Sequence, residues 1–336
     1  MTLATLRKIK ALVDAGATLV GDKPVASPSL SDDPATFARL ADALWSGDAG
    51  AGHVMTGMPV EDALAKLGVA PDHLVVGAGS SPLAFVHRKL DDGDLWYVSN
   101  PTDRALMPEI SFRSAGRAPE LFDAQTGEIT PLDYRIENGR TIVKLDLIAN
   151  ASALVVFRRP ATVPSRVTMP LVEIGRMPLS ADWVATFQPG RGAPAGALPL
   201  PLGSWTDAGD AGIRYFSGTA SYTCSFSRGA PARGHRVWLD LGDVREIAEV
   251  SLNGRPLRTL WTAPYRVDVT AELKPGRNVL TVAVTNLWAN RLIGDLQPGA
   301  TKITTTFFPN YTPGAPLRPS GLLGPVALIE RAPATR

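Results

Sequence analysis

The residues that most often do chemistry are few in this chain and are widely spaced. The four histidines, His53, His73, His87 and His235, form no His-x-His or His-Glu-x-x-His spacing. Cys224 is the single cysteine, so neither an internal disulfide nor a cysteine-based metal site is predicted. No Gly-x-Ser-x-Gly segment is present to supply a serine nucleophile. We therefore assign no metal ligand, no cofactor-binding residue and no nucleophile.

Paired carboxylates are the other machinery to consider, because glycoside hydrolysis uses two of them about 5–9 Å apart. The acidic clusters stand before a helix (Asp32-Asp33), in a turn (Asp91-Asp92-Gly93-Asp94) and beside a strand entry (Glu246 and Glu249). Aspartate is favoured at helix caps and in turns for backbone reasons. We expect the aspartates to be structural and Glu246 and Glu249 to be solvated, so no catalytic residue is assigned.

Aromatic residues are more suggestive, since the apolar face of a sugar ring stacks on an indole. Four tryptophans share the C-terminal part of the chain: Trp205, Trp238, Trp261 and Trp288. Trp288 ends an apolar strand and precedes Asn290, Arg291 and Asp295 at an exit from strand to loop. These four residues are the candidate carbohydrate-binding set. Filling of a core and anchoring of a loop are the alternatives.

The composition does not determine the cellular compartment of the protein. The 336 residues carry a net charge of +2, which favours neither nucleic acid nor an anionic membrane as a partner. No apolar run approaches the roughly 20 residues that span a bilayer. Arg7, Lys8, Lys10 and Asp14 interrupt the N-terminal apolar residues, so the first residues do not resemble a signal peptide.

Hydrophobic periodicity predicts a mainly β chain with a partial α/β segment at residues 1–80. That segment alternates helices at 3–16, 35–45 and 59–67 with short strands at 17–20 and 53–55. The apolar face of the first helix, with Leu3, Leu6, Ile9 and Val13, needs a wider sheet to cover it. We therefore expect much of that face to be exposed, and Met1 not to be the natural start or the chain to be a truncated gene product.

From residue 81 onward the period changes to two. Residues 81–160 predict a small antiparallel β-sandwich, with strands at 83–89, 95–99, 106–113, 120–122, 140–147 and 153–158. Residues 161–175 are Pro-rich and are expected to be a linker. Residues 176–336 predict an antiparallel jelly roll, in which Asn253-Gly254 forms a tight hairpin turn.

Several segments resemble glycoside hydrolases. FSGTASYTCSF and LDLGDVREIAEVSLNGRPLRTLWTAPYRVDVTAELKPGRNVLTVAVTN are similar to the galactose-binding-like jelly roll of glycoside hydrolase family 2. NLWANRLIGD and RPSGLLGPVAL narrow the resemblance to the α-L-rhamnosidases of family 106. VGDKPVASPSL and PELFDAQTGEITPL also resemble that family, so the motifs extend over nearly the whole chain.

The resemblance implies a C-terminal, accessory region of such an enzyme. Relatives carry an N-terminal (β/α) barrel with two catalytic glutamates and calcium, and none of the glutamates here matches that pair. The 1–80 segment then corresponds to the tail of an amidotransferase-like domain. The implied partners are rhamnose-containing glycans and the barrel itself, and full-length relatives are expected to be exported. The alternatives are a free-standing carbohydrate-binding module and an active enzyme with its site at a domain junction.

Overall fold

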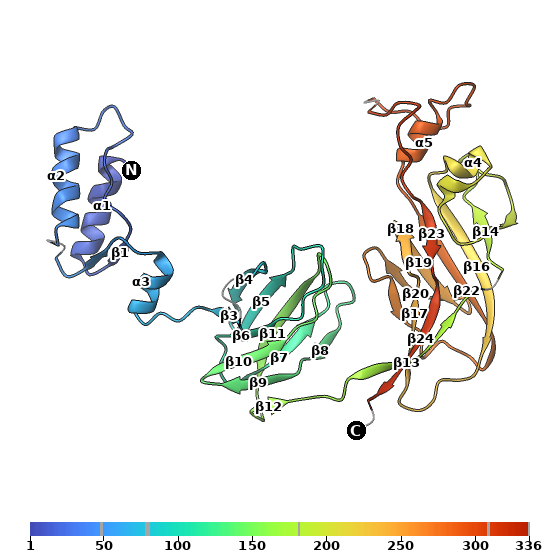
Figure 1. The fold of residues 1–336 in the computed structure, drawn as a ribbon, viewed down its shortest axis with the longest axis horizontal. Helices are drawn as coiled ribbons and strands as arrows, with labels where there is room; N and C mark the ends of the chain where they lie inside the picture. Colours follow the sequence, from blue (N-terminus) through green and yellow to red (C-terminus); the bar gives the residue numbers. More distant parts are fainter. Residues whose placement is uncertain (48–49, 78–80, 181, 308–309, 335–336) are drawn as a thin grey trace. The chain divides into compact units, whose positions relative to one another are not determined.

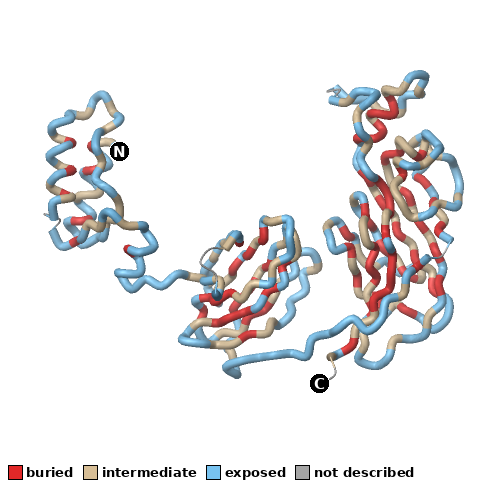
Figure 2. The backbone as a smooth tube through the Cα atoms, viewed as in Figure 1, coloured by how far each residue is buried: buried red, intermediate tan, exposed pale blue. Residues whose placement is uncertain are grey.

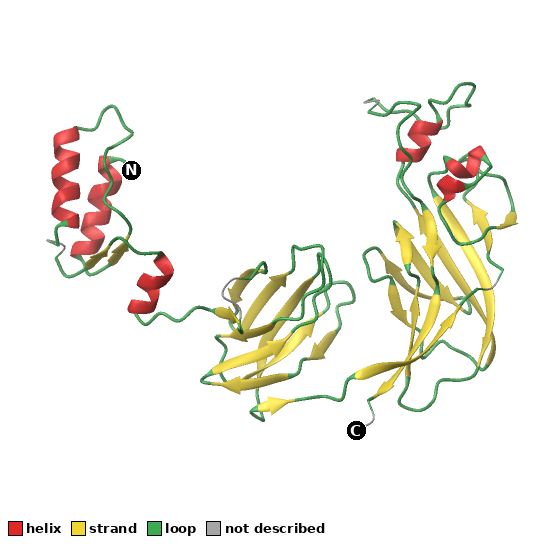
Figure 3. Cartoon of the chain, viewed as in Figure 1, coloured by secondary structure: helices red, strands yellow, loops and turns green. Residues whose placement is uncertain are grey.

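The structure, a computed structural model, describes residues 1–47, 50–77, 81–180, 182–307 and 310–334. The chain divides into two compact units, Met1–Thr168 and Met169–Arg336 (Figure 1). Strands predominate in the described residues, as the sequence predicted (Figure 3). No helix within these ranges is long and apolar enough to cross a membrane.

The first part of unit 1 is a small α/β segment. Its elements are α1 (Leu3–Asp14), β1 (Thr18–Val20), α2 (Pro34–Trp45), β2 (His53–Met55) and α3 (Val60–Lys66). Strands β1 and β2 pair in parallel. Helix α2 begins where the sequence predicted a cap, because the Asp33 side chain accepts a hydrogen bond from the Thr36 N–H at 2.7 Å.

The expected exposure of the α1 face is wrong. Leu6 and Val13 of α1 are 0% and 2% exposed, and they share a buried cluster with Phe37, Ala41 and Leu44 of α2. The second helix therefore covers this face, and a wide sheet is not needed.

The second part of unit 1 is an antiparallel sandwich of two five-stranded sheets. One sheet has the order β12-β9-β10-β6-β3 and the other β4-β5-β11-β7-β8. The strand bounds in the first sheet are β3 (His73–Val75), β6 (Glu109–Phe112), β9 (Tyr134–Glu137), β10 (Arg140–Lys144) and β12 (Ser165–Arg166). In the second sheet they are β4 (Ala84–Lys89), β5 (Asp94–Ser99), β7 (Arg117–Phe122), β8 (Ile129–Pro131) and β11 (Ser152–Pro160).

A single apolar core joins these two sheets. Trp96, Phe112 and Phe157 are each 0% exposed, and their rings lie 5.2–5.4 Å apart between centroids. Figure 2 shows the same pattern, with buried residues concentrated along the strands.

Two predicted boundaries need correction. Strand β3 lies within the expected α/β range of 1–80, but it pairs with β6 of the sandwich. The expected linker at 161–175 contains β12, which pairs with β9, and the start of β13 (Leu171–Pro178), which pairs with β24. Edge strands such as β3, β12 and β13 show no strong alternation of apolar and polar residues, so their pairing could not be predicted from the sequence.

Unit 2 is the predicted antiparallel jelly roll. A four-stranded sheet has the order β13-β24-β17-β21, a six-stranded sheet β15-β14-β16-β22-β19-β20, and a short ladder joins β18 to β23. The first sheet adds β17 (Arg236–Asp240), β21 (Arg266–Asp268) and β24 (Ala327–Pro333). The second comprises β14 (Val184–Phe187), β15 (Ala197–Pro199), β16 (Thr219–Arg228), β19 (Ile247–Leu252), β20 (Arg255–Leu260) and β22 (Gly276–Thr285). The remaining elements are η1 (Trp205–Asp207), α4 (Ala211–Arg214), β18 (Asp243–Arg245), α5 (Ala289–Gly294) and β23 (Gly321–Gly324).

The hairpin predicted at Asn253-Gly254 is confirmed. Both residues have positive φ, 55° and 79°, and they join β19 to the antiparallel β20. Asparagine and glycine tolerate this conformation, which matches the twist of a tight hairpin.

Candidate functional site

The candidate residues lie where β22, a central strand of the six-stranded sheet of unit 2, leaves that sheet. Strand β22 ends at Thr285, and helix α5 starts four residues later with Trp288 at its N-cap (Figure 1). Between them Asn286, 9% exposed, accepts the Gly218 N–H at 2.9 Å and donates to the Phe216 carbonyl at 2.8 Å. The exit from the strand is therefore held by side chain to backbone hydrogen bonds.

Asn290 fastens α5 to the segment that leads into β23. Its side-chain amide donates to the Arg318 carbonyl at 2.7 Å and to Ser320 Oγ at 3.0 Å, and its oxygen accepts the Arg318 N–H at 2.8 Å. Asn290 is 1% exposed, so these polar atoms bind the protein and not the solvent.

Arg291 and Asp295 form a buried ion pair one helical turn apart. Arg291 Nε lies 2.9 Å from Asp295 Oδ1, and the two side chains are 6% and 5% exposed. The other carboxylate oxygen, Oδ2, accepts the backbone N–H groups of Ile303 and Thr304 at 3.1 and 2.7 Å. The carboxylate thus anchors the irregular segment that follows α5.

Two glycines make room for the Arg291 guanidinium because they carry no side chain. A Cβ at Gly294 would lie 2.6 Å from Arg291 Nη2 and 2.5 Å from the Tyr215 Cβ. A Cβ at Gly192 would lie 3.1 Å from Arg291 Nη1. The arginine therefore packs directly against backbone from two separate segments, which fixes its position.

Trp288 is the one member of the predicted set that lies at the surface. Its side chain is 43% exposed, and the Arg191 guanidinium carbon lies 4.5 Å from the centre of its ring. Leu287 beside it is 45% exposed. An exposed indole next to a cation and an aliphatic side chain offers both a stacking face and hydrogen-bond donors.

The structure thus brings the four predicted residues together but gives them different surroundings. Asn290, Arg291 and Asp295 are buried, and they bind backbone and side-chain groups of α5 and of the segments that follow it. They hold the α5 region in place, which leaves Trp288 as the member that can meet a ligand.

Sequence reasoning missed Arg191 and Ser217. Ser217 Oγ accepts the Arg291 N–H at 3.1 Å and donates to the Leu287 carbonyl at 2.8 Å. Arg191 lies in the Pro- and Gly-rich segment after β14. Neither residue belongs to a periodic pattern, and both reach α5 only through tertiary folding.

The single cysteine of the sequence lies in the core of unit 2. Cys224 is buried in the jelly-roll core, and that burial raises the pKa of its thiol to about 12, so it stays protonated at neutral pH. Within the described ranges, no group of three or more His, Cys, Asp or Glu side chains is placed to hold a metal ion.

Each of the two units contains a segment that matches a known protein family. Residues 1–136 match glycoside hydrolase family 106, described as α-L-rhamnosidase, and residues 210–306 match the glycoside hydrolase family 2 galactose-binding-like domain. A rhamnosidase from Novosphingobium sp. PP1Y has 41% identical residues and a TM-score of 0.87, over 98% of this chain and 32% of that enzyme. Over nearly its whole length the chain is therefore similar to a region of a rhamnosidase.

A second relative matches a shorter part of the chain. A putative β-glucuronidase from Formosa agariphila is 55% identical over 96 residues, which is 28% of this chain and 8% of that protein. The chain therefore spans about a third of the Novosphingobium rhamnosidase and less than a tenth of the Formosa protein.

Proposed function

We propose that this chain is an accessory region of an α-L-rhamnosidase-like glycoside hydrolase, and that it contacts the glycan through Trp288 while a (β/α) barrel supplies the hydrolytic residues. The observation that carries the proposal is the exposed Trp288 ring, which stands on a buried scaffold of Asn290, Arg291 and Asp295. A rigid scaffold holds the ring in place before the ligand arrives, so little ordering entropy is lost on binding.

The ligand class follows from the chemistry of this surface. A rhamnose unit has an apolar ring face and a methyl group in place of the usual hydroxymethyl, and both suit contact with an indole and with Leu287. Arg191, whose guanidinium lies over the Trp288 ring, can donate to sugar hydroxyls beside that ring. Rhamnose-containing glycans are therefore the ligands we propose.

The accessory role is supported by the contacts of the carboxylate at the end of α5. A glycosidase needs one carboxyl group free to protonate the leaving oxygen and another free to act as base or nucleophile. Asp295 instead holds Arg291 and two backbone N–H groups, so it is committed to the fold.

The accessory role is tested by hydrolysis of an aryl α-L-rhamnoside by the purified chain, with and without added calcium. We expect no turnover above the blank, with an active rhamnosidase as the positive control. Turnover that disappears on substitution of a single Asp or Glu in the chain would show that catalytic residues lie within it.

A further inference from the structure

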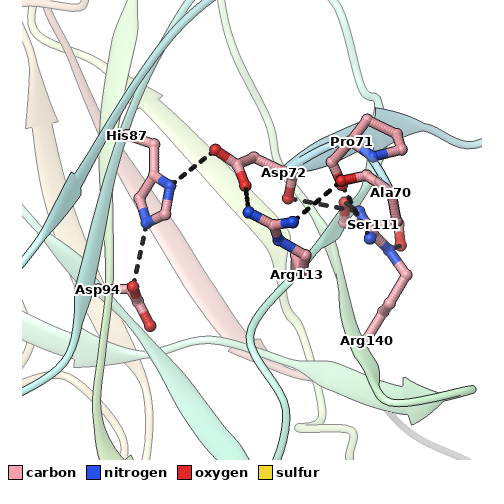
Figure 4. Close-up of polar contacts among 8 residues, drawn as sticks. All are labelled: Ala70, Pro71, Asp72, His87, Asp94, Ser111, Arg113 and Arg140. Atoms are coloured by element: carbon pink, nitrogen blue, oxygen red, sulfur yellow. Dashed lines mark hydrogen bonds and ion pairs between the residues drawn. The ribbon is translucent and has the colours of Figure 1, made fainter. Parts of the chain in front are cut away.

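A polar cluster in unit 1 surrounds the segment that leads from α3 into the sandwich. Arg113 Nη1 donates to the Ala70 carbonyl at 3.1 Å, and Arg140 Nη1 donates to the Pro71 carbonyl at 3.0 Å (Figure 4). The Arg113 guanidinium also pairs with the Asp72 carboxylate. Immediately after Asp72, the segment enters the first sheet as β3.

His87 connects this segment to the second sheet. Its Nδ1 lies 3.1 Å from Asp72 Oδ2, and its Nε2 lies 3.0 Å from Asp94 Oδ1 (Figure 4). His87 belongs to β4 and Asp94 begins β5, whereas Asp72 directly precedes β3 of the other sheet. The imidazole is therefore a bridge between the two layers.

The bridge requires a particular protonation state. An ionised carboxylate only accepts hydrogen bonds, and a neutral imidazole has one N–H and one lone pair. A neutral His87 would set its lone pair against one of the two carboxylates. The imidazolium donates at both nitrogens and is the form that satisfies this geometry.

Neighbouring groups hold the ring in position and keep its partner ionised. The His87 ring stacks on Trp96 with 4.0 Å between centroids and 6° between planes. The hydrogen bond from His87 lowers the pKa of Asp72, partial burial opposes this, and the charge of Arg113 lowers the pKa further. His73 of β3 is the nearby second imidazole, and its burial lowers its pKa.

We propose that His87 is a proton-operated clamp on the 70–75 segment. In the protonated form it ties Asp72 to Asp94 and so holds the segment against both sheets. When His87 loses its proton, one of the two bonds is lost and the bridge between Asp72 and Asp94 is broken, while Arg113, Arg140 and the β3–β6 pairing still hold the segment. This inference concerns the connection to the α/β segment and does not depend on the proposed sugar contact.

Amide hydrogen exchange of the full chain tests the clamp, at pH values from 5.5 to 8.0 across which imidazole ordinarily titrates. After correction for intrinsic exchange, we expect the protection of the amides of Ala70 and of residues 72–75 to fall about tenfold as the pH rises, because one charge-assisted hydrogen bond is lost. The His87→Phe variant keeps a ring over Trp96, but its side chain has no N–H. Its protection should therefore be low at both pH 5.5 and pH 8.0. His53→Gln, at an exposed histidine of β2 outside this segment, is the matched control and should retain the wild-type pH dependence.

A second readout protects the test against a variant that does not fold. In the wild type, the ¹⁵N shifts of the His87 ring should show both nitrogens protonated at pH 5.5. Equal protection of the segment at both pH values, or the same pH dependence in His87→Phe, would overturn the proposal. A wild-type His87 ring that is neutral at pH 5.5 would also overturn it.

Discussion

Arg291 and Asp295 of the NLWANRLIGD motif form a buried ion pair that stabilises the fold. Both charges are almost fully buried, and the carboxylate also receives two backbone N–H groups. Removal of one partner leaves an uncompensated buried charge, which is far more costly than the loss of a surface ion pair.

We therefore predict that Asp295→Ala lowers the free energy of unfolding by about 3–5 kcal/mol. Urea denaturation followed by tryptophan fluorescence measures the change. Glu249→Ala, at an exposed position of β19, is the control and should stay within about 0.5 kcal/mol of the wild type. An Asp295→Ala protein as stable as that control would contradict the structural role of the pair.

Glu330 gives a prediction about pH at the same scale. Its carboxylate accepts from His235 Nδ1 at 2.7 Å and from Arg228 Nη2 at 2.6 Å. The hydrogen bond from His235 lowers the pKa of Glu330, burial opposes it, and the charge of Arg228 lowers the pKa further. A lowered folded-state pKa means that the stabilisation is present above the unfolded value, about 4.3, and is lost as the pH falls through the folded value.

The corresponding experiment compares wild type with Glu330→Gln in denaturation series from pH 7 to pH 3. We expect the wild type to be more stable at neutral pH, and the difference to shrink as the pH falls below about 4.3. A difference that stays constant over this range would show that ionisation of Glu330 contributes nothing to stability.

At the scale of elements, local signals in the sequence located most strands and helices. Asp33 capped α2 as predicted, and Asn253-Gly254 turned β19 into β20, because both effects depend on neighbours in the chain. The pairing of β13 with β24 was not predicted, since its partners lie at opposite ends of unit 2. The Arg191 contact with Trp288 was missed for the same reason, and only folding brings these side chains together.

Strand β23 depends on a glycine at its first position. Gly321 has a φ of +107°, and a Cβ there would lie 2.5 Å from Trp205 Nε1. Trp205 is 1% exposed and donates to the Tyr222 hydroxyl at 2.5 Å, so it has little room to move.

Gly321→Ala should therefore destabilise the chain by about 2–4 kcal/mol, through backbone strain and overpacking together. Thermal unfolding by circular dichroism measures this loss. Gly229→Ala is the matched control, because a Cβ at Gly229 meets nothing within 4 Å, and its midpoint should be unchanged or slightly higher. Similar midpoints for the two variants would show that Trp205 yields more easily than its packing indicates.

At the scale of the whole molecule, the division at residue 169 predicts where the chain can be cut. The expected jelly-roll boundary at 176 falls inside β13, which pairs with β24 from Leu171 to Pro178. Residues 169–336 retain this edge strand, whereas residues 179–336 lose it and expose the edge of β24.

We predict that a polypeptide of residues 169–336 unfolds in one cooperative transition. A polypeptide of residues 179–336 should unfold at a lower urea concentration and self-associate more readily, because an unpaired strand edge can pair with another chain. Urea denaturation and sedimentation measure the two properties. Equal midpoints would mean that β13 contributes little to unit 2.

The most direct test of the proposed function is titration of a rhamnose-containing oligosaccharide into the full chain by isothermal calorimetry. The wild type should bind, and Trp288→Ala should weaken binding about three- to tenfold through loss of the stacking face. Trp261→Ala removes another exposed tryptophan of unit 2 that is not part of the α5 cluster, and it should bind as the wild type does. An unchanged affinity in a Trp288→Ala protein that remains folded would contradict the claim that this surface contacts the glycan.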